Sequence, residues 1–302
     1  MSQYKPWAAF LFVGLFAWGT SFLWIKIGVA EIGPFTLVAL RITFAVISAW
    51  VYIRLAGIKL PRDSRPWIVM AVLGLLNICI PFTLISWGET RIDSVLAGLI
   101  NSTVPLFTVV LAHFFVNDDR ITFLKIFGVL VGFGGVAVLV GRDIRVQGVS
   151  GDILGQIAVL VSSLAYAVSG VTIRKYLREV HPIVITAGAA TAALVVMWIL
   201  APVIEAPFHL PREPLTWVAI VWLGTIGTTS AYLAYFYLIG TWGPTRASTV
   251  TYVIPIVAVV LGVVFLGEEI GWQLIVGGLG IIAGILILNW HNLHSLLSQA
   301  TR

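Results

Sequence analysis

Long apolar segments separated by short polar turns follow one another along the whole 302-residue chain. A bilayer core of about 30 Å needs about 20 residues of helix. The pattern predicts ten such helices, at about 7–29, 34–55, 66–87, 92–116, 121–140, 151–174, 181–204, 215–238, 244–266 and 271–290. The segments are rich in Ala, Leu, Ile, Val and Gly without alternation, which favours helices over a barrel. We therefore expect an all-α integral membrane protein.

The second half of the chain repeats the first. Shifts of 150 and 148 residues align Trp67 with Trp217, Gly74 with Gly224, Pro105 with Pro255, Ser21 with Ser169 and Pro34 with Pro182. An odd number of helices in each copy turns the second copy over in the bilayer, as in alternating-access carriers. The expected organisation is a first five-helix repeat at 1–146 and a second, inverted five-helix repeat at 147–302.

Composition supports a membrane location. The chain is 59% hydrophobic and 10% charged, whereas soluble domains average about 25% charged residues. Basic residues flank the apolar segments, which favours a role in topology over nucleic-acid binding. The one cysteine, Cys79, excludes a disulfide framework and a cysteine metal cluster, and we expect no cofactor and no metal. The first apolar segment leads into a second, so we expect no cleaved signal peptide.

The distribution of Lys and Arg predicts the orientation. With the N-terminus in the cytoplasm, twelve basic residues fall on the cytoplasmic side and five on the other. The positive-inside rule then places both termini in the cytoplasm and the protein in the cell (inner) membrane.

Charges within the spans are scarce. All 13 acidic residues fall in loops or at span ends, Glu31 and Glu89 among them. Ion-coupled carriers commonly keep a carboxylate at mid-helix, so we expect uncoupled facilitated diffusion or exchange of a net neutral solute. Lys26 is expected to extend to the interface. Arg41, two turns into the second helix, should pair with Glu31 or a helix C-terminus. Either Lys26 or Arg41 could instead meet a substrate carboxylate at the outer mouth.

The candidate substrate site combines deep aromatic rings with uncharged polar groups. Ring walls suit an apolar or aromatic solute, although any one ring can equally serve packing, and membrane hydroxyls often bond to backbone. The predicted cavity residues are Trp18, Ser21, Asn77, Asn101, Ser163, Tyr166, Thr229, Tyr232 and Tyr252. No catalytic residue is predicted.

Two prolines and a set of glycines complete the sequence features. Pro105 and Pro255 lie midway along the fourth and ninth helices and free carbonyls near Asn101 and Thr251. We expect them to be gating hinges, with a static kink as the alternative. The glycines of the fifth and tenth helices should allow close helix contact, within a scaffold or in a dimer; they are Gly128, Gly132, Gly134, Gly135, Gly277, Gly278, Gly280 and Gly284.

Short motifs in a fixed order give the chain a family resemblance. They are Trp18-Gly19-Thr20-Ser21-Phe22 with Lys26, Leu40-Arg41, the two prolines, and Leu266-Gly267-Glu268. The chain resembles the ten-helix EamA-type branch of the drug/metabolite transporter superfamily. It departs at Asn117-Asp118-Asp119, where the family usually has Gly-Glu. The resemblance implies a carrier of small metabolites, often an exporter, with amino-acid exporters, aromatic ones included, as the nearest functional group.

The expected function is therefore export of small neutral metabolites, most of all amino acids including aromatic or large apolar ones, by alternating access. Alternatives are a carrier of nucleosides, sugar conjugates or other neutral metabolites and drugs, and, more distantly, a non-transport membrane scaffold. An enzyme is disfavoured because no deep Asp or oriented Ser–His pair is evident. Expected partners are a small-molecule substrate and the lipid bilayer, with no nucleic acid; the protein would be a monomer or homodimer.

Overall fold

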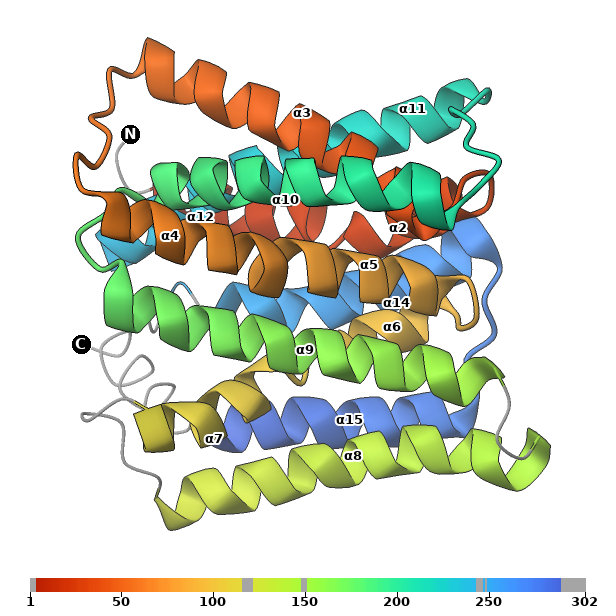
Figure 1. Cartoon of the computed structure of the whole chain (residues 1–302). Helices are drawn as coiled ribbons and strands as arrows, with labels where there is room; N and C mark the ends of the chain where they lie inside the picture. The colour runs from red at the N-terminus through yellow and green to blue at the C-terminus, as the bar shows by residue number, and fades with distance from the viewer. Residues whose placement is uncertain (1–3, 116–121, 148–150, 243–246, 248, 289–302) are drawn as a thin grey trace.

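The helices lie side by side with their axes roughly aligned (Figure 1). The computed structural model describes residues 4–115, 122–147, 151–242, 247 and 249–288, without side chains for residues 4, 141–147, 151 and 152. All regular structure in these residues is helical. Nine helices within them are long and apolar enough to cross a membrane, and Trp272–Leu288 is a shorter apolar helix. The predicted all-α membrane fold is confirmed.

Several predicted spans consist of more than one helical element. The first half contains α1 (Tyr4–Leu11), η1 (Phe12–Ala17), α2 (Ser21–Val29), α3 (Pro34–Leu55), α4 (Ser64–Leu73), η2 (Gly74–Cys79), α5 (Ile80–Glu89), α6 (Ser94–Asn101), α7 (Val104–Phe115) and α8 (Phe123–Gln147). The second half contains α9 (Gly151–Tyr176), α10 (Pro182–Ile204), α11 (Pro214–Val221), η3 (Trp222–Ser230), α12 (Ala231–Trp242), η4 (Thr249–Tyr252), α14 (Val253–Leu266) and α15 (Trp272–Leu288).

Helix α8 is longer than predicted, because it continues to Gln147 where the hydropathy pattern ends near residue 140. Its last turns contain no proline, and one glycine does not stop a helix. Residues 117–119, where the chain departs from the family pattern, lie outside the described residues.

Three spans contain π-helical turns, which the sequence pattern did not predict: η1, η2 and η3. Such turns are rare and are frequent at functional sites. Gly74 at the start of η2 packs on the α10 backbone, since a Cβ there would lie 2.6 Å from the Ala189 carbonyl oxygen. Gly224 in η3 packs in the same way on α3, with 2.5 Å to the carbonyl oxygen of Arg41. Positions 150 residues apart thus make matching contacts across the two halves.

The fourth span breaks before Pro105 rather than bending at it. Helix α6 ends at Asn101 and α7 starts at Val104, so Pro105 occupies the first turn of a new helix. The Thr103 and Ser163 hydroxyls donate to the Ile100 carbonyl at 2.7 and 3.4 Å. Pro255 likewise lies in the first turn of α14, after the 3₁₀ turn η4. Each proline therefore stands in the first turn of a helix that restarts within its span, and the role of the two prolines as gating hinges stays a prediction.

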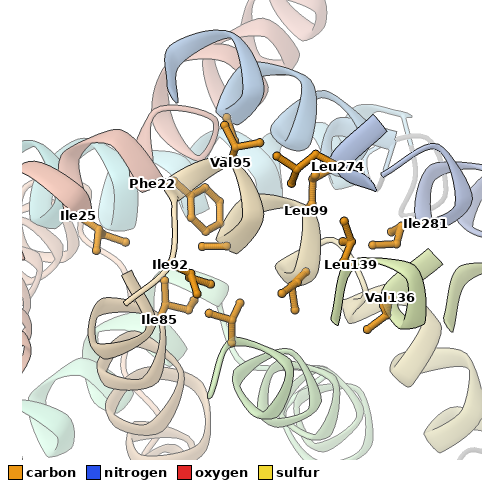
Figure 2. Close-up of a cluster of buried hydrophobic side chains, with 14 of the residues drawn as sticks. Phe22, Ile25, Ile85, Ile92, Val95, Leu99, Val136, Leu139, Leu274 and Ile281 are labelled. Atoms are coloured by element: carbon orange, nitrogen blue, oxygen red, sulfur yellow. The ribbon is translucent and has the colours of Figure 1, made fainter. Parts of the chain in front are cut away.

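A large apolar core lies where α2, α5, α6, α8, α9 and α15 approach one another, and Figure 2 shows its side chains converging from these helices. Phe22, Ile85, Val95 and Leu99 are at most 5% exposed. These contacts join elements of both halves, so the halves share one core.

Helices α8 and α15 meet along a line of glycines. A Cβ on Gly135 would lie 2.5 Å from the Gly277 carbonyl oxygen, and one on Gly284 would lie 2.5 Å from the Gly128 carbonyl oxygen and the Gly132 nitrogen. Without side chains the backbones come this close. The expected close glycine packing is therefore an intrachain contact.

Candidate functional site

Aromatic side chains from both halves meet around Trp18, which follows η1 directly. The Trp18 ring lies 5.8 Å from that of Tyr232 and 5.1 Å from that of Tyr235, centroid to centroid. Tyr232 also stacks on Phe236 at 5.9 Å, and the Asn77 amide of η2 donates to the Tyr232 hydroxyl at 3.4 Å. Three predicted residues, Trp18, Asn77 and Tyr232, are thus brought together at π-helical segments from opposite halves.

Arg41 lies beside this aromatic group and is 6% exposed. Its Nε and Nη2 atoms are 3.4 and 3.3 Å from the Thr228 hydroxyl oxygen, and its guanidinium lies 3.8 Å from the centroid of the Phe82 ring. Tyr166, another predicted residue, and Tyr232 are within electrostatic range of the guanidinium. The sequence analysis treated Arg41 as a charge in need of a partner and left it out of the site. The depth of Arg41 within an apolar span was the feature of the sequence that could have indicated its place beside this site.

The remaining predicted residues are more dispersed. Ser21 donates to the Ala17 carbonyl at 2.9 Å, and Ser163 donates to the Val159 carbonyl at 3.1 Å. Thr229 donates to the Ala45 carbonyl at 3.1 Å and accepts from Ser48 at 2.8 Å. These hydroxyls therefore bond to backbone carbonyls of their own or a neighbouring helix, which was the alternative to a role in substrate binding. Asn101 and Tyr252 are half-buried beside the breaks in the fourth and ninth spans.

Carboxylates bind helix N-termini across the two halves at one end of the bundle, on the right in Figure 1. We call it the capped end; it consists of the connections 30–33, 90–93, 205–213 and 267–271. Glu205 accepts from the backbone N–H groups of Phe35 and Thr36 at 2.7 and 2.9 Å. Glu268 accepts from those of Ser94 and Val95 at 2.8 and 2.9 Å. Both satisfy N–H groups that a helix start leaves unpaired, where the dipole favours negative charge.

Glu31 makes a third such contact, in which the first half supplies the carboxylate and the second half supplies the N–H groups. Its carboxylate accepts from the backbone N–H groups of Arg212 and Glu213, just before α11, at 2.5 and 3.0 Å. The adjacent Thr216 hydroxyl and these two N–H groups hold the pKa of Glu31 below its ordinary value. Glu31 is therefore not the partner of Arg41, as had been suggested, because it is bound to the second half.

The capped end also explains the Leu266-Gly267-Glu268 motif. Gly267 ends α14 in the left-handed conformation, with φ +67°, which glycine adopts at little cost. The turn directs Glu268 toward α6, and Gly262 leaves room for it, since a Cβ there would lie 2.6 Å from Glu268 Oε2.

Lys26 and Glu89 lie close together near the same end. The half-buried Lys26 ammonium donates to the carbonyl oxygens of Glu89 and Ile92, both at 2.8 Å, so it reaches the connection at the end of its span. Glu89 ends α5 as predicted, but its side chain is fully buried, and neither carboxylate oxygen has a hydrogen-bond partner among the described residues. Glu89 was predicted at a span end, and no prediction was made of its burial. The packing of α2, α6 and α9 over it could not be read from its position in the sequence.

Metal chemistry has no evident location in the described part of the chain, where no group of three or more His, Cys, Asp or Glu side chains is arranged to hold an ion.

A multi-helix membrane bundle with a polar, aromatic centre between its halves defines a multi-pass membrane transporter. The chain belongs to the EamA-like transporter family, whose model matches residues 5–141 and again 153–290. Its relatives include the uncharacterized inner membrane transporter YedA of Escherichia coli K12, 30% identical over 95% of this chain and 91% of YedA. A probable terminal-alkyne amino-acid exporter of Streptantibioticus cattleyicolor is 26% identical over 94% of this chain and 92% of that protein.

A solved crystal structure shares the fold. It is 21% identical in sequence, with a TM-score of 0.66 over 95% of this chain and 96% of that chain. The family and the membrane-spanning helices identify this chain as a multi-pass membrane transporter.

Proposed function

We propose that the protein exports small neutral metabolites, most of all amino acids including aromatic or large apolar ones, by alternating access. The observation that carries the substrate class is the ring group of Trp18, Tyr232 and Tyr235, set between the two halves beside polar groups. The relative named as a probable amino-acid exporter supports the same class. Residues 1–146 and 147–302 would be inverted repeats that rock about this centre, with the restarts at Pro105 and Pro255 as hinges and both termini in the cytoplasm.

The first test is flux in proteoliposomes preloaded with neutral amino acids, nucleosides and sugars. We expect amino acids such as phenylalanine, tryptophan, methionine or threonine to move, and Trp18→Ala to reduce that flux roughly 2- to 10-fold, because a ring pair contributes about 0.5–1.5 kcal/mol beyond its buried area. Trp272→Ala is the matched control, since Trp272 is 65% exposed. Movement of nucleosides or sugars without amino acids would agree with a transport function and reject the amino-acid substrate.

Transport is proposed to be facilitated diffusion or exchange, and Glu89 is the group that would bind a proton if transport were coupled. The charged groups within its electrostatic range are Lys26, Arg41 and Glu268, and α9 contributes the buried, neutral Gln156. A buried carboxylate without hydrogen bonds is costly when ionised, so the absence of a mid-helix carboxylate no longer argues against coupling by itself.

Imposing an inward or outward proton gradient on the same proteoliposomes tests the mechanism. For an uncoupled carrier, amino-acid flux is independent of the gradient in the wild type and in Glu89→Gln. Accumulation that follows the gradient in the wild type, and in Glu269→Gln, but disappears in Glu89→Gln would overturn facilitated diffusion and identify Glu89 as the coupling group. Glu269 is the control because it is an exposed neighbour of Glu268.

A further inference from the structure

Arg41 is a buried cation, and Glu89 is the carboxylate within its electrostatic range. Arg41 lies seven residues into α3, about 10 Å along the axis at 1.5 Å per residue. Among the described residues it hydrogen-bonds to the neutral Thr228, at 3.3–3.4 Å, and none of the described carboxylates forms an ion pair with it. A guanidinium carries five N–H donors, so most of them are unused. A charge at this depth is expensive, and such residues usually mark a substrate or ion pathway.

Helix packing does not account for the arginine. Gly224 rests on the α3 backbone at Arg41 and Ala45 in the way that Gly74 rests on the α10 backbone at Ala189 and Ala193. The two contacts are equivalent in the repeat, and an alanine occupies the position of Arg41 in the second. A small neutral residue is therefore sufficient for this contact, and the guanidinium is an addition to one half only.

The surroundings of Arg41 suit one end of an amphiphilic anion. Phe82 covers one face of the guanidinium at 3.8 Å, which fixes its plane. Thr228 lies one helical turn before Tyr232, so the two side chains share a face of the eighth span, and Tyr232 leads on to the Trp18 ring. A planar cation held at the edge of a ring wall binds a carboxylate by two parallel hydrogen bonds, while the rings accept the apolar part of the same molecule.

The other cation near this site is already engaged. The Lys26 ammonium donates to two backbone carbonyls at 2.8 Å, so it has fewer N–H groups left to bind a solute carboxylate than Arg41 has.

We propose that Arg41 binds the carboxylate of the transported solute and so restricts the carrier to carboxylate-bearing substrates. The proposal deepens the proposed function and rests on it for the identity of the solute. Arg41 is then the residue that orients the solute, with its carboxylate toward α3 and its apolar part toward Trp18.

Ligand binding to the purified carrier tests this independently of flux. The probes are 3-phenylpropionate, which has the carboxylate and no amine, and 2-phenylethylamine, which has the amine and no carboxylate; both are titrated by tryptophan fluorescence. We expect the wild type to bind 3-phenylpropionate more tightly than 2-phenylethylamine. Arg41→Gln should weaken 3-phenylpropionate binding roughly 10- to 100-fold, as expected for a hydrogen bond to a charged group, and Arg41→Lys should weaken it less.

Arg91→Gln is the matched control, because Arg91 also lies over a ring, 3.6 Å from the centroid of Trp87, but is exposed. A purely structural Arg41 would lower stability without changing the ratio of the two affinities. Equal binding of both probes by the wild type, or an unchanged ratio in Arg41→Gln, overturns the proposal. Selective carboxylate binding combined with no amino-acid flux would instead retain Arg41 as the anchor and reject the amino-acid substrate.

Discussion

Replacing Gly284 with leucine is expected to prevent the protein from folding stably. The first side-chain atom alone would lie 2.5 Å from backbone atoms of Gly128 and Gly132, and a helix backbone cannot move aside as a flexible side chain can. Overpacking of a close contact costs about 1–3 kcal/mol and occasionally more. Here α8 and α15 would have to separate along their contact. Size-exclusion chromatography in detergent should show aggregated protein, or a clearly lowered melting temperature.

Gly134→Leu is the control for this prediction. Gly134 lies on the same helix α8, within the same glycine-rich stretch, but a Cβ there has no atom within 4 Å. It should therefore remain folded and melt close to the wild type. A Gly284→Leu protein that behaves like Gly134→Leu would mean that α8 and α15 are not in the close contact described.

The second large effect concerns the capped end. A Cβ on Gly33 would coincide with the Glu205 carboxylate, so Gly33→Ala should displace that carboxylate from the N–H groups of Phe35 and Thr36. Losing hydrogen bonds to a charged group shifts an equilibrium by roughly 10-fold or more. The capped end should consequently open more often. In a Cys79→Ser background, an Ile92→Cys side chain, buried in the wild type with 4% exposure, should react roughly 10-fold faster with a membrane-impermeant maleimide.

Two further variants make the interpretation specific. Glu205→Gln removes the charge while preserving the shape and should act in the same direction. Gly170→Ala adds a methyl group where nothing lies within 4 Å and should leave the rate unchanged. If Gly33→Ala reacted no faster than Gly170→Ala, the Glu205 cap would not hold this end closed.

Hydropathy predicted the spans well, because burial in lipid depends on composition averaged over about 20 residues. The residue-level site was harder. Trp18, Asn77 and Tyr232 came together as three members of the predicted set, but Ser163 and Thr229 are occupied by backbone carbonyls. The sequence position of a Ser or Thr does not determine which hydrogen-bond acceptor lies next to its hydroxyl. The π-helical turns depend on local hydrogen-bond geometry, which no hydropathy pattern encodes.

Charged residues were the least predictable from the sequence. Glu89 and Glu205 both end an apolar helix, yet one is fully buried without a hydrogen-bond partner among the described residues and the other binds the N-terminus of α3. The difference arises from which helices pack over each end, and that depends on contacts between residues far apart in the chain. For Arg41 the energetic argument from sequence indicated that a buried charge needs a partner, but the suggested partner Glu31 is bound to the second half.

The carboxylate contacts also differ between the two ends of the bundle. In the repeat, Glu31 corresponds to Glu179, and the Arg212–Glu213 segment corresponds to Arg62–Asp63, at the opposite end of the bundle. Glu179 is exposed, free to make the matching contact once the capped end separates. Glu205 has no such counterpart, because Gly57 occupies the equivalent position. Glu205 therefore gives the capped end a carboxylate contact that the repeat does not supply at the opposite end. With the proposed orientation, this additional contact lies on the side of the membrane away from the cytoplasm.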